Sequence, residues 1–395
     1  MREATLRDHA NILLTASGRS DVPPFMVMDV MAAAERIEAA GGHVIHMEVG
    51  QPAARAPKTA IVAARAALEG GRIDYTSARG IPSLRERIAR HYQDTYGCAV
   101  DPGRIVVTTG SSSAFILAFL AMFEPGDRVA VTVPGYPPYR HILTALGCEP
   151  VLVETSSETR HALTGEALLA AHRRTPLKGV LVGSPANPTG TMMSREALTS
   201  LIAAAEGAGI RFISDEIYHG LDYAFPAATA AALSERALVI NSFSKYFCMT
   251  GWRVGWMVVP EPLVRPIERL QQNLSISVPT LSQIAAEAAF EGREEMEAIK
   301  HGYQENRRIL IEGLPQAGLT DFLPADGAFY LYADVSKFTS DSFAFASEML
   351  EKTHVAATPG IDFDPVHGRA FIRLSYARSP SEMHEAVSRI TRWLR

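Results

Sequence analysis

The segment NSFSKYFCMTGWRVGW, residues 241–256, places a lysine and an arginine in an otherwise apolar and aromatic stretch. Lysine is almost never fully buried unless it is paired or chemically used. In a dry pocket the amine of Lys245 would lose part of its preference for charge and could form a Schiff base. Arg253 offers a fixed donor fork that suits a phosphate. For either residue alone, a lysine that reaches solvent and an arginine in a structural ion pair are the simpler explanations.

Other polar clusters also follow predicted strands. In GSSS, Ser111 and Ser112 open an apolar helix whose N-terminus could bind a phosphate. In GSPANPTG, Asn187 lies between two prolines that could aim its amide at a ligand. In RFISDEIYHG, Asp215 ends a strand that reads as buried, where a carboxylate needs a positive partner to stay ionised. Taken alone, each cluster is better explained as a helix cap or a turn.

Together, these clusters indicate a catalytic site that binds a cofactor. A phosphate cradle, a strand-end aspartate, a lysine able to form a Schiff base and an arginine all map to the same edge of one predicted sheet. Pyridoxal 5'-phosphate carries a phosphate, an aldehyde and a basic ring nitrogen, and it needs such a set of groups. The sequence therefore predicts a pyridoxal-phosphate site.

The elements that must position these residues alternate along the chain from about residue 100 to 260. The predicted strands are 105–109, 128–133, 179–183, 211–215, 237–241 and 254–258, with helices such as 112–123 and 194–208 between them. This alternation predicts βα units, a largely parallel sheet and a site at the carboxyl ends of its strands. A helical region over 262–314 with a break near 277–279, then shorter strands and closing helices, predicts a second, α+β lobe.

Composition excludes several classes of protein. The 395 residues exceed the length at which one hydrophobic core keeps growing, which favours two lobes. A net charge of −5 without a basic run disfavours nucleic-acid and membrane partners. The longest apolar stretch, AFILAFLAMF, is too short to span a bilayer, and the N-terminus is a poor signal peptide. Three scattered cysteines predict neither a disulfide framework nor a metal site, so we expect a cytoplasmic protein.

The chain resembles the fold type I pyridoxal-phosphate enzymes, specifically the class I/II, aspartate aminotransferase-like family. SFSKYFCMTGWRVGW closely matches the lysine motif of that family, and SPANPTG and SDEIYHG match too. The resemblance implies a large domain with a mostly parallel seven-stranded sheet flanked by helices, plus a smaller α+β domain. We expect residues 1–50 to form an N-terminal arm and part of the small domain, 51–290 the large cofactor-binding domain, and 291–395 the small C-terminal domain.

The resemblance also implies a role for each group around the cofactor. Lys245 would hold the cofactor as a Schiff base and later move the substrate proton. Asp215 would pair with the ring nitrogen, and Asn187 and Tyr218 would hydrogen-bond the ring oxygen. Tyr136 would stack on the ring. The phosphate would be held by four side chains: Ser111, Ser112, Ser242 and Arg253.

Substrate and subunit contacts follow from the same resemblance. Arg373, in RLSYA, would bind the substrate α-carboxylate next to Asn187, a bidentate task that suits arginine. Gly50 would let the backbone approach the substrate. Tyr75, in DYTSARG, would reach the phosphate of a neighbouring subunit, which implies a homodimer with shared active sites.

The expected activity is that of an aminotransferase, which moves the amino group of an α-amino acid to a 2-oxo acid. A pyridoxal-phosphate lyase or synthase on the same scaffold, for example a β-eliminating C–S lyase, would use the same residues and stands as the alternative. The intact lysine and arginine disfavour a non-catalytic sensor module. A nicotinamide dehydrogenase and a metal hydrolase are disfavoured because the sequence has no G-x-G-x-x-G after a strand and no H-E-x-x-H.

The substrate side chain is less constrained by the motifs. The sequence shows no motif with a second arginine of the kind that would indicate a dicarboxylic substrate. The N-terminal stretch DVPPFMVMDV could contribute apolar side chains to the pocket. This favours neutral or hydrophobic amino acids.

Overall fold

The computed structural model describes residues 15–71 and 73–395. Residues 1–14, part of the expected N-terminal arm, lie outside the described residues.

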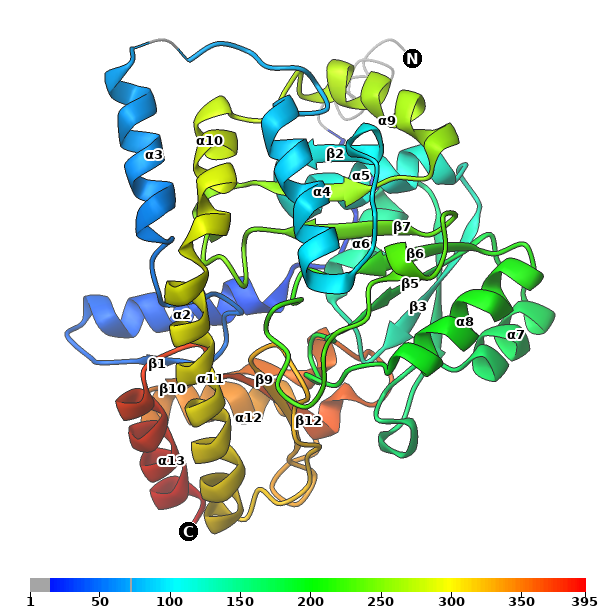
Figure 1. Cartoon of the computed structure of the whole chain (residues 1–395). Helices are drawn as coiled ribbons and strands as arrows, with labels where there is room; N and C mark the ends of the chain where they lie inside the picture. Colours follow the sequence, from blue (N-terminus) through cyan, green and yellow to red (C-terminus); the bar gives the residue numbers. More distant parts are fainter. Residues whose placement is uncertain (1–14, 72) are drawn as a thin grey trace, which may run out of the picture.

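The centre of the molecule is a seven-stranded sheet in the order β2-β8-β7-β6-β5-β3-β4 (Figure 1). Its strands are β2 (Ile105–Thr108), β3 (Arg128–Val133), β4 (Glu149–Glu154), β5 (Gly179–Gly183), β6 (Arg211–Asp215), β7 (Leu238–Ser242) and β8 (Gly255–Val258). Strands β3 to β7 run parallel, and β8 is antiparallel to both of its neighbours. The expected α/β fold is confirmed.

Strand β4 is absent from the strands predicted from the sequence. It forms an edge of the sheet, is largely part-exposed, and contains Pro150. Edge strands tolerate proline, whereas a proline within an apolar run argues against a central strand. The pattern of this segment therefore did not resemble that of the buried strands beside it.

Helices cover both faces of the sheet, as the buried strands require. On one face lie α5 (Gly110–Met122), α6 (Pro137–Ala145) and α9 (Glu261–Leu274). On the other lie α3 (Lys58–Glu69), α4 (Pro82–Tyr96), α7 (Gly165–Arg174), α8 (Arg195–Gly207) and α10 (Thr280–Ala289). Alternate residues of one strand serve the two cores: Val106 packs in the first and Val107 in the second. Helices α5 and α8 correspond to the two helices predicted from the sequence.

A smaller group of elements packs around a third apolar core beside the carboxyl edge of the sheet. A three-stranded antiparallel sheet has the order β11-β12-β9, and β1 pairs with β10. These strands are β1 (Ile45–His46), β9 (Tyr330–Asp334), β10 (Val355–Ala356), β11 (Thr358–Pro359) and β12 (Phe371–Ser375). The helices are α2 (Met26–Ala39), α11 (Arg293–Gly313), α12 (Ser342–Thr353) and α13 (Pro380–Leu394). In Figure 1, α11 runs from the helices of the large sheet to these C-terminal elements. The expected domain boundaries stay a prediction.

Short 3-10 helices connect the larger elements: η1 (Gly18–Ser20), η2 (Pro102–Arg104), η3 (Ser157–Thr159), η4 (Ala230–Ala232), η5 (Thr250–Trp252), η6 (Phe290–Gly292), η7 (Leu314–Ala317), η8 (Gly360–Asp362) and η9 (Gly368–Ala370). Helix α9 ends at Leu274 and α10 begins at Thr280, so the helical region breaks where the sequence predicted. Within residues 15–71 and 73–395, none of the helices combines the length and the apolar character that crossing a membrane requires.

Candidate active site

A cavity of about 240 Å³ lies where the carboxyl ends of β6 and β7 face strands β9 and β12. The sequence-predicted residues that line it are Gly50, Ser111, Ser112, Tyr136, Asn187, Asp215, Tyr218, Lys245, Arg253 and Arg373. Most of these residues follow strands of the central sheet and meet at the carboxyl edge of its parallel strands, as expected. Gly50 and Arg373 come instead from the smaller group of elements, after β1 and within β12. Their individual roles stay predictions.

Lys245 places its amine inside this cavity. Strand β7 ends at Ser242, and three residues later the Nζ of Lys245 donates a hydrogen bond to the carbonyl oxygen of Gly50 at 2.6 Å. Burial lowers the pKa of the amine to about 8, helped by the positive charges of Arg373 and Arg253 and opposed by Asp215. A lysine in this state is a usable nucleophile near neutral pH.

Asp215 is buried at the end of β6 and has two hydrogen-bond donors. The hydroxyl of Tyr139 donates to its Oδ2, and the backbone N–H of Ile217 donates to its Oδ1 at 3.0 Å. Burial raises the pKa of Asp215 to about 6, and Glu216 adds to the rise, while these two donors and Lys245 oppose it. A positively charged ring nitrogen at this position would favour the ionised carboxylate further.

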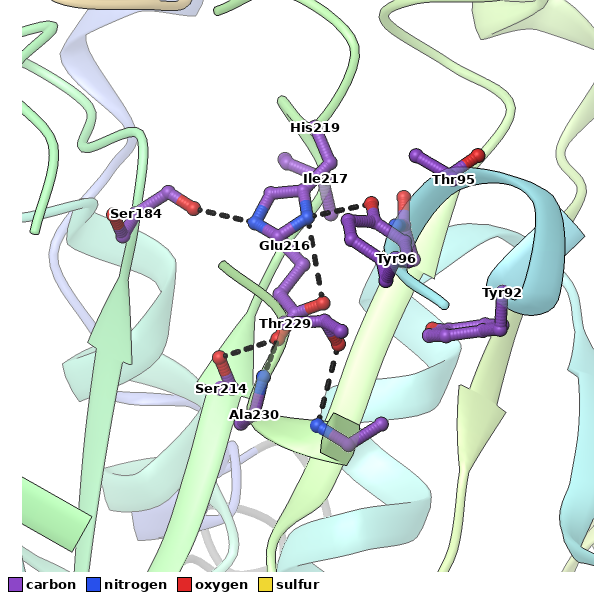
Figure 2. Close-up of polar contacts among 12 residues, drawn as sticks. Tyr92, Thr95, Tyr96, Ser184, Ser214, Glu216, Ile217, His219, Thr229 and Ala230 are labelled. Atoms are coloured by element: carbon purple, nitrogen blue, oxygen red, sulfur yellow. Dashed lines mark hydrogen bonds and ion pairs between the residues drawn. The ribbon is translucent and has the colours of Figure 1, made fainter. Parts of the chain in front are cut away.

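A buried polar cluster supports the turn that follows Asp215 (Figure 2). The Nε2 of His219 lies 3.0 Å from the carbonyl oxygen of Ser184, and its Nδ1 lies 2.8 Å from the hydroxyl of Tyr96 and 3.5 Å from a carboxylate oxygen of Glu216. Ser184 begins the loop that carries the predicted amide ligand. His219 therefore ties that loop to the turn behind Asp215, and this fixes two walls of the cavity relative to each other.

Arg373 is 1 % exposed and projects from β12 into the cavity. Its Nη1 donates to the Oδ1 of Asn187 at 2.9 Å, and its Nη2 donates to the backbone carbonyl of Glu48 and, at 3.1 Å, to the hydroxyl of Thr358. Its Nε has no hydrogen-bond partner among the residues that the structure describes. The guanidinium is thus held by neutral groups and keeps its positive charge available for an anion.

Aromatic rings hold the same guanidinium in its plane. The Cζ of Arg373 lies 4.5 Å from the ring centroid of Tyr330 and 4.7 Å from that of Phe363. The hydroxyl of Tyr330 lies 2.7 Å from that of Tyr218, so the two tyrosines form one wall. A Cβ on Gly50 would lie 1.9 Å from the hydroxyl oxygen of Tyr330. Only glycine therefore fits at that position without moving this wall.

The opposite end of the cavity suits a phosphate. Helix α5 begins at Gly110 with Ser111 and Ser112 in its first turn, and no side chain of its N-cap residue caps it. Gly110 has a φ of 70°, and a Cβ there would come 2.4 Å from the Nη2 of Arg253. Arg253, also in the left-handed region, donates from Nη1 to the carbonyl of Thr250 at 3.0 Å. Backbone N–H groups of the first turn of α5, hydroxyls and a guanidinium converge there.

Two predicted residues lie outside the lining of the cavity. The hydroxyl oxygen of Ser242 lies 2.9 Å from that of Ser244 and 3.2 Å from the carbonyl oxygen of Val254, and Ser244 lines the cavity instead. Tyr75 is 80 % exposed. Their predicted contacts with a phosphate stay predictions.

Sequence reasoning missed two tyrosines of the site. Tyr139 follows Tyr136 by one helical turn in PGYPPYR, and this spacing could have suggested that both face the same strand ends. Tyr330 lies in a strand, where the alternation of side chains between the two faces predicts only that its ring faces a core. Among the described residues, no group of three or more His, Cys, Asp or Glu side chains could hold a metal ion.

Comparisons with known proteins identify the family. The model of the aminotransferase class I and II family matches residues 42–390, so the chain belongs to this family. The valine–pyruvate aminotransferase of Mycobacterium tuberculosis is 48% identical over 380 residues, which are 95% of this chain and 97% of that protein. The (5-formylfuran-3-yl)methyl phosphate transaminase of Methanocaldococcus jannaschii is 35% identical, over 94% of this chain and 96% of that protein.

Comparison with solved structures identifies the same family. A crystal structure of an aminotransferase from Mycobacterium tuberculosis superposes with a TM-score of 0.93 at 47% identity, over 96% of this chain and 99% of that one. The aspartate aminotransferase from Thermus thermophilus superposes with a TM-score of 0.89 at 31% identity, over 96% and 99% of the two chains. The chain is therefore an aminotransferase, which confirms the leading expectation.

Proposed function

We propose that the cavity binds pyridoxal 5'-phosphate and that the enzyme moves the amino group of a neutral, apolar α-amino acid to a 2-oxo acid. The observation that carries this is the amine of Lys245, with its pKa near 8, in one cavity with Asp215 and Arg373. The donor set fits the cofactor: an amine for the aldehyde, a carboxylate for the ring nitrogen, and a helix N-terminus for the phosphate. When bound, the cofactor supplies an electron sink for the substrate Cα.

The residues of the chain would hold and move the proton. With a pKa of about 8, roughly a tenth of the Lys245 amine is neutral at pH 7 and about half at pH 8. Lys245 can therefore accept a proton at Nζ and return it near neutral pH. Asp215 is mostly ionised above pH about 6, and Tyr139 and Ile217 hold its two oxygens in place.

Arg373 would orient the substrate. Its Nη1 lies beside the Oδ1 of Asn187 in the lining of the cavity, so a carboxylate there could be bound by the guanidinium and the Asn187 amide together. Because Tyr330 and Phe363 hold the guanidinium plane, the carboxylate is fixed in one orientation. This places the substrate Cα at a set distance from Lys245.

The lining supports a neutral, apolar substrate side chain. Phe25, Val27, Met28, Val49 and Ile217 contribute apolar groups to the cavity. Among the described residues, its cations are Lys245, Arg253 and Arg373, and each has another proposed partner. A second carboxylate would therefore have to be buried without a partner, which is unfavourable. The similarity to a protein named valine–pyruvate aminotransferase supports the same substrate class.

An amino-donor panel tests the substrate class. Purified holoenzyme would be incubated with pyruvate and, in turn, with valine, leucine, aspartate or glutamate, and alanine formation would be measured. We expect valine and leucine to be donors with the higher kcat/KM. A panel in which aspartate and glutamate alone react would overturn the proposed substrate class.

We further propose a homodimer in which Tyr75 completes the site of the neighbouring subunit. Tyr75 is exposed, and Val62, Leu68, Leu274 and Ile276 are exposed apolar side chains that a partner could cover. Mixing Lys245→Ala and Tyr75→Ala subunits would create hybrids with one intact site. If hybrids form randomly, activity should return to about a quarter of the wild-type value. No recovery, in a mixture shown by mass spectrometry to contain hybrids, would refute the shared site.

We propose a cytoplasmic location for the enzyme. Cys98, Cys148 and Cys248 are free thiols, which suits a reducing compartment. Cell fractionation with an antibody to the protein would test this, and recovery in an extracytoplasmic fraction would contradict it.

A further inference from the structure

A buried histidine–glutamate pair lies next to the segment that contacts Arg373 and Lys245. The Nδ1 of His46, the last residue of β1, lies 2.8 Å from the Oε1 of Glu48. Glu48 is 0 % exposed, and among the described residues its Oε2 has no hydrogen-bond partner. Because a buried carboxylate is unfavourable unless it is paired, the contact with His46 is needed to stabilise its charge.

The contacts of the imidazole ring require that it carries two protons. The Nε2 of His46 lies 3.2 Å from the Oε1 of Glu38 in helix α2, which packs against β10, the partner strand of β1 (Figure 1). Carboxylate oxygens only accept hydrogen bonds, so both ring nitrogens must donate. The pKa of His46 is raised above its ordinary value, mainly by the hydrogen bond to Glu48, although burial and the charge of Arg378 oppose this. His46 and Glu48 therefore form an ion pair.

The backbone that follows this pair contacts two cations of the active site. The carbonyl oxygen of Glu48 accepts a hydrogen bond from the Nη2 of Arg373. Two residues later, the carbonyl oxygen of Gly50 accepts one from the Nζ of Lys245 at 2.6 Å. The position of residues 48–50 therefore affects the guanidinium and the amine together.

The side chain of Glu48 anchors a stretch that has few other anchors. The N–H of Ser375 donates to the carbonyl oxygen of Met47 at 2.7 Å, and the next backbone bond along the chain is made by the N–H of Ala53. Among the described residues, 48–52 make no backbone–backbone hydrogen bond. The buried carboxylate of Glu48 is thus the feature that fixes this stretch between its two ends.

We propose that His46 and Glu48 are positioning residues for substrate binding. The imidazolium fixes the buried carboxylate, and this holds residues 48–50 so that their carbonyl oxygens align Arg373 and Lys245. The proposal rests on the role of Arg373 in substrate binding proposed above. Because every α-amino acid presents the same carboxylate to Arg373, the pair should affect KM equally for substrates with different side chains.

The test compares holoenzyme of the wild type with His46→Gln and Glu48→Gln. Both variants break the ion pair, but only His46→Gln leaves a buried carboxylate without its partner. Both should raise KM by about tenfold and reduce kcat by less than about threefold, because a hydrogen bond between charged groups is lost. The increase in KM should be the same for valine and alanine. The double variant should have a higher Tm than His46→Gln alone, because it lacks the unpaired charge.

Two further measurements on the same proteins do not depend on turnover. Amide hydrogen exchange at Ser375 and Ala53, whose backbone bonds flank the stretch, should become faster in both variants. The imidazole resonance that is missing from His46→Gln identifies His46, and it should titrate at a lower pH in Glu48→Gln than in the wild type. Glu38→Gln is the matched control: it removes the other contact of the same ring, which is partly exposed, and KM should stay within about twofold.

A wild-type KM in Glu48→Gln, or a His46 imidazole that titrates identically in Glu48→Gln and the wild type, would overturn the proposal. An equal increase in KM in Glu38→Gln would also overturn it, because the effect would then come from α2. If the wild type transaminated neither valine nor alanine, the proposed function would fail, whereas exchange and titration would still decide whether the pair holds this stretch.

Discussion

Removing the hydroxyl of Tyr139 should weaken cofactor binding through Asp215. This hydroxyl donates to the buried carboxylate and lowers its pKa, which stands at about 6. A hydrogen bond to a charged group contributes about 1.5–3 kcal/mol, which corresponds to about one to two pKa units. In Tyr139→Phe the pKa of Asp215 should therefore rise to about 7–8, so that the carboxylate is largely protonated at pH 7.

The consequence is measurable as affinity for pyridoxal 5'-phosphate. Apoenzyme would be titrated with the cofactor between about pH 6.5 and about pH 9, and the visible absorption band would report binding. At about pH 7 the variant should bind about tenfold more weakly than the wild type, equivalent to about 1.4 kcal/mol. The difference should shrink toward about pH 9, because Asp215 is then ionised in both proteins.

Tyr92→Phe is the control for this experiment. Tyr92 is buried too, but its hydroxyl accepts a hydrogen bond from Trp256, and Tyr92 does not line the cavity. Its loss should change stability and leave cofactor affinity within about twofold. If Tyr139→Phe bound the cofactor as tightly as the wild type at every pH, the assignment of Tyr139 as the residue that keeps Asp215 ionised would be wrong.

Three further outcomes follow from the geometry. Gly50→Ala should reduce kcat/KM by about tenfold or more, because its Cβ would displace Tyr330 and with it the Arg373 wall. Gly207→Ala, whose Cβ meets open space, is the control and should leave kcat/KM unchanged. Arg373→Lys should raise KM for alanine by about a hundredfold, because lysine cannot bind a carboxylate with two fixed donors; an unchanged KM would remove Arg373 from the substrate site. The rate at which apoenzyme forms a Schiff base with added cofactor should rise with pH and reach half its maximum near pH 8, where the Lys245 amine loses its proton; a pH-independent rate would contradict the lowered pKa.

Much of the site could be predicted because its residues follow strands. The parallel strands β6 and β7 end in Asp215 and Ser242, and the carboxyl ends of neighbouring parallel strands meet at one edge. Local sequence therefore placed Asp215 and Lys245 together without knowledge of the tertiary fold. Family resemblance was needed for Arg373, since nothing in a lone RLSYA strand indicates a substrate ligand.

Contacts that depend on tertiary packing could not be predicted in this way. Which of the two nearby hydroxyls, Ser242 or Ser244, lines the cavity depends on how the chain turns after β7. Such contacts depend on how separate elements pack, which a single sequence does not state.

The most direct test of the active-site assignment is the visible absorption spectrum of the purified enzyme, before and after addition of valine and then pyruvate. The wild type should show the band of a cofactor bound to Lys245, lose it with valine, and regain it with pyruvate, whereas Lys245→Ala should not complete this cycle. Absence of the band after added pyridoxal 5'-phosphate, or a Lys245→Ala enzyme that turns over at the wild-type rate, would contradict the central role of Lys245.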